Sequence, residues 1–255
     1  MVFSQRGLRS VGSVMALGAL LACSSSSSEP STANDGGGAD GGGVGSSTET
    51  KQTGRAAVVQ TATPIPGAVV SAGGTQATAD ADGNYAITVP RGKPITLKLS
   101  APDHLQLIEQ EYIVDTPSYA RGDSLLIKTA TARLLAAFLP GYDEAKGLLA
   151  VKVVPMSGCA TEGGTTLTLE PPGAELKYTK GGLPDSSTSV TAGENNGALF
   201  YNVTPRLPVK VTATHPTCKQ LPFPVEYQGV KYTGAQTTEP GESFSFVRVF
   251  LGPGT

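Results

Sequence analysis

The sequence lacks tryptophan, and aromatic side chains make up only 6% of its 255 residues. Proteins that bind sugars on a sheet usually present a flat row of aromatic rings, so this composition argues against such a platform. The 19 Lys and Arg residues are balanced by 21 Asp and Glu residues. A basic patch is therefore not expected, and nucleic acid is excluded as a partner.

The chain is also poor in the side chains of reaction centres. No Gly-rich phosphate loop, cluster of metal ligands or carboxylate pair stands out from the turn-rich background. The two histidines, His104 and His215, follow corresponding strands of the expected fold but have no carboxylate or Cys at ligand spacing. We therefore expect no metal, no cofactor and no enzyme activity.

Long apolar runs are missing except at the N-terminus. Arg6 and Arg9 precede the run VGSVMALGALLA, which has the length of a signal-peptide core and is too short to span a bilayer. Residues 1–22 are predicted to be a cleaved signal peptide.

The run ends Leu20-Leu21-Ala22-Cys23, which resembles the lipobox of bacterial lipoproteins. The resemblance implies that Cys23 carries a diacylglyceryl group, becomes the mature N-terminus and anchors the chain to a membrane. The alternative is an ordinary secretory signal with an incidental Cys. Ser24 stands where Asp would retain a lipoprotein in the inner membrane. The expected location is therefore the cell envelope, in the outer membrane of a Gram-negative bacterium.

A Ser- and Gly-rich segment follows the anchor. Residues 23–54 are almost devoid of apolar side chains and cannot bury enough surface to offset the entropy of ordering. We expect a disordered tether of about 30 residues with an r.m.s. span of about 30 Å.

The remainder predicts an all-β protein. Apolar residues alternate at Tyr85, Ile87 and Val89, as in a strand with one buried face. The string Thr78 to Pro90, with its DADGNY turn, resembles the carboxypeptidase regulatory-like domain. That resemblance implies a transthyretin-like β-sandwich over 55–128 with a scaffolding or binding role.

The second half repeats this pattern. A shift of 114 residues aligns Gly83 with Gly197, Val89 with Val203 and Leu97 with Val211. We predict two tandem transthyretin-like sandwiches, the second over 148–255 with a long polar insertion from Pro171 to Glu194. One continuous Greek-key domain is the alternative.

The predicted connector over 129–147 is a short α-helix. Thr131 is its expected cap, and Pro140-Gly141 its end. Its apolar Leu134, Leu135 and Phe138 are expected to pack on a sandwich.

Two cysteines remain once Cys23 is assigned to lipid. Cys159 and Cys218 are an even remainder in a protein exported to an oxidising compartment, so we predict one disulfide between them.

Two short motifs overlap in YARGDSLLI. GDSL is the signature of a family of serine esterases, but Ser124 is followed by no Asp-x-x-His that could supply a base. RGD is the tripeptide of adhesion ligands. We interpret Arg121-Gly122-Asp123 as a turn and Leu125 to Ile127 as the last strand of the first sandwich.

These observations predict a lipid-anchored envelope protein that is a non-catalytic binding or assembly module. Its expected partners are the membrane and an envelope protein or polysaccharide. The candidate ligand-facing aromatics are Tyr178, Tyr201, Tyr227 and Tyr232, and Phe200 and Tyr201 are expected to face opposite sides of one strand. The alternatives are a passive surface spacer or coat component and an esterase centred on Ser124.

Overall fold

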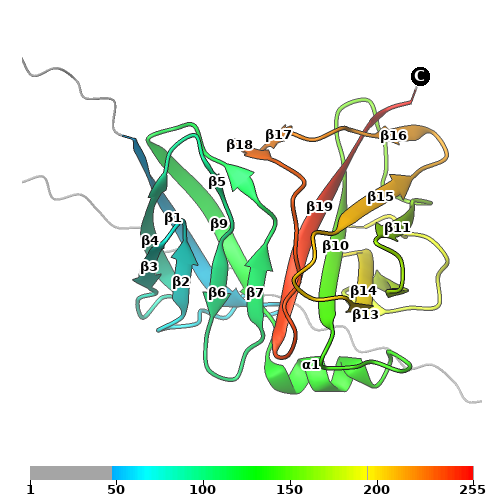
Figure 1. The fold of residues 1–255 in the computed structure, drawn as a ribbon, viewed down its shortest axis with the longest axis horizontal. Coiled ribbons are helices and arrows are strands. Elements are labelled where there is room, and N and C mark those ends of the chain that lie inside the picture. The colour runs from blue at the N-terminus through cyan, green and yellow to red at the C-terminus, as the bar shows by residue number, and fades with distance from the viewer. Residues whose placement is uncertain (1–47, 194, 255) are drawn as a thin grey trace, which may run out of the picture. The chain divides into compact units, whose positions relative to one another are not determined.

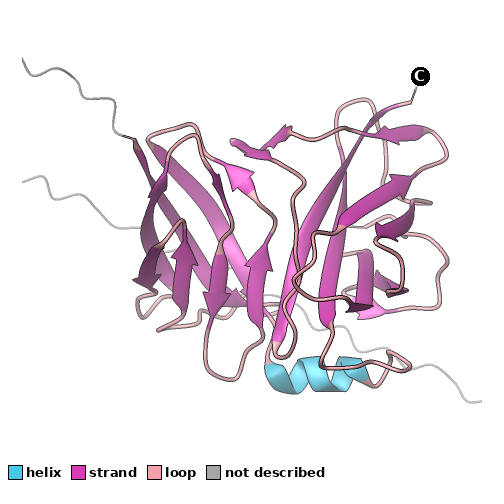
Figure 2. Ribbon diagram, viewed as in Figure 1, coloured by secondary structure: helices cyan, strands magenta, loops and turns pink. Residues whose placement is uncertain are grey.

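A computed structural model describes residues 48–193 and 195–254. Strands dominate this part of the chain, and α1 (Thr129–Ala136) is the helix within it (Figure 2). The all-β class predicted from the sequence is confirmed, with sheets arranged as in a sandwich. No helix among these residues is long and apolar enough to cross a membrane.

The strands of the first half are β1 (Glu49–Val58), β2 (Val69–Ala72), β3 (Thr75–Thr78), β4 (Asn84–Pro90), β5 (Pro94–Ile95), β6 (Lys98–Ser100), β7 (Gln106–Glu109), β8 (Tyr112–Ile113) and β9 (Ser118–Leu126). Those that follow α1 are β10 (Gly147–Pro155), β11 (Thr166–Glu170), β12 (Glu175–Lys180), β13 (Leu183–Pro184), β14 (Gly197–Val203), β15 (Lys210–Thr214), β16 (Cys218–Gln220), β17 (Val225–Tyr227), β18 (Val230–Tyr232) and β19 (Ser243–Pro253).

The strand pairings of the first half recur in the second. β1 pairs antiparallel with β4 and parallel with β9, and β10 pairs in the same way with β14 and β19. The antiparallel pair of β2 and β6 corresponds to that of β11 and β15. The register also agrees with the predicted shift of 114 positions. Lys98 and Ser100 of β6 pair with β2, and Thr212 and Thr214, 114 positions later, pair in the same order with β11.

The two halves share one sheet. β19, the last strand in the sequence, lies between β10 of the second half and β7 of the first and pairs parallel with both (Figure 1). A ten-stranded sheet results, and β18 also pairs with β8 across the halves. The predicted domain limits at 128 and 148 stay a prediction, but hydrogen bonds cross them.

The apolar residues form two cores, and the first includes Phe244 and Phe250 of β19. The first is built around Leu97, Leu99 and Tyr112, and the second around Leu149, Phe200 and Val249. Alternating burial along β4 confirms the predicted inward face of Tyr85, Ile87 and Val89. Sandwich layers therefore follow from the period-two pattern that the sequence displays.

Two expectations about the limits of strands and loops need correction. Residues 49–54 are the start of β1 and not part of the tether. The sequence did not indicate a strand here because the inward residues, Thr50 and Gln52, are polar, although both are fully buried. Likewise, the insertion from Pro171 to Glu194 is not merely loop. It carries β12, which extends the shared sheet by pairing with β14.

The helix also differs from its expected form. α1 begins after Lys128, so Thr131 lies inside it and caps nothing. No residue of α1 is buried, and Leu134 and Phe138 face solvent. The helix packs against the first core through the partly buried Ala132, and the segment behind it is fixed because Leu139 is buried and Asn202 bonds to Gly141 and Asp143.

Candidate functional site

The GDSL serine has no catalytic surroundings. Ser124 is buried on β9, and its Oγ lies 3.2 Å from the Tyr85 hydroxyl. His104 bonds through Nδ1 to the carbonyl of Pro102, and His215 bonds to residues of the second half. Ser124 thus lacks a base that could remove its proton, which a serine nucleophile requires.

The RGD tripeptide is part of strand β9, not a turn. Its register against β1 shifts between Thr53 and Arg55, and Gly122 adopts φ of +81° there, so the motif forms a β-bulge. Asp123 forms an ion pair with Arg55, with 2.6 Å between Oδ2 and Nη2. The side chain of Arg121 is buried, with 5% of its surface exposed. The motif therefore cannot be displayed as a protruding adhesive loop.

Arg121 belongs to a buried charge cluster that the sequence did not reveal. Glu109 on β7 accepts Arg121 Nη2 at 2.7 Å and Arg248 Nη1 at 3.2 Å. The Arg121 guanidinium lies 5.1 Å from the ring centroid of Tyr112, and that of Arg248 lies 5.4 Å from Tyr232. Because Arg248 comes from β19, the cluster joins the two halves.

The electrostatics of this cluster favour the charged states of Glu109 and Arg121. Burial raises the pKa of Glu109, but the charges and hydrogen bonds of Arg121 and Arg248 outweigh burial, so this pKa lies below its usual range. Burial lowers the pKa of Arg121, and Glu109 more than reverses that. A buried carboxylate held between two guanidinium groups, which themselves lie over aromatic rings, joins strands of the fold and is closed to a substrate.

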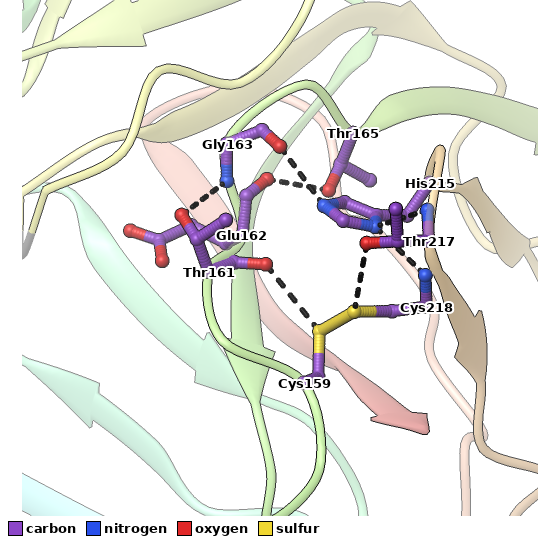
Figure 3. The surroundings of a disulfide bond; sticks show 8 residues. All are labelled: Cys159, Thr161, Glu162, Gly163, Thr165, His215, Thr217 and Cys218. Atoms are coloured by element: carbon purple, nitrogen blue, oxygen red, sulfur yellow. Dashed lines mark hydrogen bonds between the residues drawn. A yellow bond between two sulfur atoms is a disulfide. The ribbon is translucent and has the colours of Figure 1, made fainter. Parts of the chain in front are cut away.

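The disulfide prediction is confirmed. Cys159 and Cys218 are bonded, and their Cα atoms lie 5.7 Å apart. The bond ties the loop after β10 to the start of β16 (Figure 3). Next to it lies His215, whose Nε2 is 2.9 Å from the Gly163 carbonyl.

The sequence did not bring His215 together with the two cysteines, yet their ligand atoms lie within 4.8 Å of one another. Cys and His are zinc ligands when a lone pair and a thiolate are free. Here both sulfurs are consumed by the disulfide, and His215 Nδ1 accepts the backbone N–H groups of Thr217 and Cys218 (Figure 3). The hydrogen bonds of His215 thus hold the turn before Cys218 against the facing loop.

The candidate aromatics do not form a ligand platform. Tyr178, Tyr201 and Tyr232 are buried, and the half-buried Tyr227 packs on Phe250 with 5.4 Å between ring centroids. Phe200 and Tyr201 were expected to face opposite sides with one exposed, but both are buried. Phe200 packs in the second core, and Tyr201 is buried next to it on β14. Cys23, the predicted lipidation site, lies outside the described residues.

No protein-family model matches the chain, and neither does any curated protein sequence. Solved structures with similar features include the Bacillus anthracis TIE protein, at 12% identity and a TM-score of 0.27, over 82% of this chain and 35% of that one. GBS52, the minor pilin of Streptococcus agalactiae, aligns at 10% identity and a TM-score of 0.25 over 81% of this chain and 98% of its own. Shaft pilin SpaA from Lactobacillus rhamnosus GG aligns at 9% identity and a TM-score of 0.23, over 82% of this chain and 98% of its own. Likenesses this distant carry no functional argument.

Proposed function

We propose that this chain is a lipid-anchored, non-catalytic binding or assembly module of the bacterial cell envelope. The observation that carries the proposal is that the chemically capable side chains serve the fold. Ser124 bonds to a tyrosine, His215 latches a turn, and Glu109 is enclosed by two arginines. Such a protein acts through its surfaces and its attachment.

Attachment in this proposal rests on the sequence around Cys23. The leader, the lipobox-like Leu20-Leu21-Ala22-Cys23 and the Ser- and Gly-rich stretch together fit a lipoprotein whose folded part stands away from the bilayer. Ser24 favours the outer membrane. In the same proposal, the first half is a carboxypeptidase regulatory-like domain and the second half its divergent copy.

Lipid attachment can be tested directly in cells that express the full chain. Cys23→Ser should abolish incorporation of labelled palmitate and leave unprocessed precursor or soluble protein after fractionation. Ser24→Ala is the matched control and should remain lipidated and membrane-bound. Unchanged membrane attachment of Cys23→Ser would refute the anchor and, with it, the proposed role.

A passive spacer is the second candidate, and the outer face of the β4-β1-β9 sheet favours it. The exposed residues there include the small, uncharged Thr53, Ala86 and Ala120, and the nearby charges of Arg55 and Asp123 pair with each other. A face of this kind offers few anchor side chains for a partner. The second half, by contrast, has an unusual strand edge.

A further inference from the structure

Just before β15, the Val209 N–H donates to the Gln236 carbonyl at 2.9 Å, and beyond that point the outer edge of β15 is met by a side chain in place of a strand. β15 pairs with β11 on one side only. On its other side, the Gln220 side-chain amide accepts the Ala213 N–H at 2.6 Å and donates to the Val211 carbonyl at 3.2 Å. A primary amide has the donor and acceptor of a peptide group, so Gln220 occupies a position that suits a neighbouring backbone.

The first half shows what fills the corresponding position. There, β6 lies between β2 and β7, and the Glu109 N–H donates to the Leu97 carbonyl at 2.9 Å. Leu99 pairs with Leu107 of β7. The shift of 114 residues converts Leu97 and Leu99 into Val211 and Ala213. The two groups bonded by Gln220 are therefore those that a complete strand serves in the first half.

In the second half, the strand that corresponds to β7 does not pair with β15. β16 follows β15 as β7 follows β6, but it pairs antiparallel with the end of β19. The Cys159–Cys218 disulfide holds the start of β16 there, away from the β15 edge. Gln220, at the end of β16, reaches back with its side chain alone.

A groove of about 630 Å³ lies along this edge. Val211 of β15 and Val247 and Val249 of β19 line it, together with Leu221 and Phe223. Lys210 is the single charged residue among its lining residues. Its side chain is 72% exposed, and its Nζ lies 3.8 Å from a carboxylate oxygen of Glu170 on β11, so a further carboxylate can reach it.

We propose that the β15 edge binds an extended peptide strand from another protein and that Gln220 occupies this edge until the strand arrives. The strand would carry apolar side chains at alternate positions, facing the valines of β19, and an acidic residue near Lys210. Main-chain hydrogen bonds give affinity in such strand addition, and alternate side chains give specificity. Meanwhile, the amide of Gln220 protects an edge that would otherwise invite aggregation.

This inference deepens the proposed function of a binding module, but its test is independent of lipid attachment. A phage-displayed library of random ten-residue peptides is selected on the full-length chain in detergent. We expect selected peptides to alternate apolar and polar residues with an excess of Asp and Glu. Their binding should slow hydrogen exchange of the Val211 amide.

Variants locate the binding edge. Gln220→Ala should tighten binding of the selected peptides about fivefold to tenfold, because the incoming strand no longer displaces two hydrogen bonds. Gln76→Ala, an exposed glutamine of β3, is the matched control and should leave affinity unchanged. Lys210→Glu changes an exposed side chain and should remove the preference for acidic peptides without altering the fold.

Failure to select any peptide on either wild type or Gln220→Ala would overturn strand binding, as would selected peptides whose affinity ignores Gln220→Ala. If Cys23→Ser still releases the protein from membranes, the anchored-module proposal survives that outcome. If Cys23→Ser stays on membranes while the selected peptides still bind, the anchor proposal fails and strand binding survives.

Discussion

The two halves use the same strand pairings but fill them with different chemistry. The first half buries Gln52, Glu109 and Arg121 among its aromatic rings, whereas the second buries valine, leucine and a disulfide. In the first half, β7 completes the layer beside β6, and in the second the matching edge of β15 is left to Gln220. The same strand pairings therefore accommodate a buried charge cluster beside the apolar core of the first half and an edge bonded by one side chain in the second.

The largest effect is expected from the charge cluster that holds the first half to β19. Glu109→Gln leaves two buried guanidinium groups without a carboxylate and should lower the free energy of unfolding by about 3–5 kcal/mol. Urea denaturation measures this. Glu242→Gln, which breaks the exposed pair with Arg133, should cost less than about 1 kcal/mol. Equal losses for the two variants would show that the cluster stabilises nothing beyond a surface pair.

The same cluster predicts the direction of acid sensitivity. Because the folded pKa of Glu109 lies below its unfolded value, its contribution is present above an ordinary carboxyl pKa of about 4.3 and is lost as pH falls through the lower folded pKa. Melting temperatures between pH 7 and pH 2 should fall less steeply in Glu109→Gln than in the wild type. A parallel fall in both would remove Glu109 as the cause.

In the second half, the disulfide is expected to stabilise the fold as the charge cluster does in the first. Its cysteines are 59 positions apart, and the chain-entropy model gives about 4 kcal/mol for a loop of this length. The double variant Cys159→Ser/Cys218→Ser should lose about that much in urea denaturation. Cys23→Ser, measured in the same way, is the control and should lose nothing. Peptide mapping without reductant that recovers two free thiols would contradict the bond itself.

Gly54 and its counterpart Ala150 give a smaller and sharper comparison. A Cβ at Gly54 would lie 2.5 Å from the Tyr85 hydroxyl, which is packed and bonded to Ser124. Gly54→Ala should therefore cost about 1–3 kcal/mol through overpacking. Ala150 pairs with Leu199, the counterpart of Tyr85, and Ala150→Gly should cost about 1 kcal/mol through backbone entropy and the loss of methyl packing. A stabilising Gly54→Ala would show that the Tyr85 position is not fixed.

The smallest effect is expected at Ser124. Ser124→Ala removes one hydrogen bond to Tyr85 and should cost about 1 kcal/mol. Purified wild-type protein should not hydrolyse short-chain p-nitrophenyl esters, and the variant should behave identically. Turnover that disappears in Ser124→Ala would overturn both the fold-serving role of this serine and the non-catalytic function.

The sequence predicted those features that depend on local pattern. Alternation gave the strands around Tyr85, the shift of 114 residues gave their recurrence, and export gave the bond between Cys159 and Cys218. It missed the features that depend on long-range pairing. Thr50 and Gln52 are polar in sequence and buried only because β1 lies between β4 and β9.

The charge cluster was hidden for the same reason. Arg121 reaches Glu109 from β9, and Arg248, far away in sequence, meets Glu109 because β19 pairs with β7. Arg121 was instead interpreted as part of an RGD turn, since a Gly between charged residues usually marks a loop. Burial of a charge cannot be recognised from composition when its counterions lie on other strands.

The central comparison is tested most directly by hydrogen exchange at two amides of the same molecule. The Leu99 N–H lies on the strand paired with β7, and the Ala213 N–H bonds to the side chain of Gln220. Because a side chain releases a hydrogen bond more readily than a paired strand does, we predict that Ala213 exchanges at least about tenfold faster than Leu99. Equal protection at the two amides would contradict the account, because the β15 edge would then be as closed as that of β6.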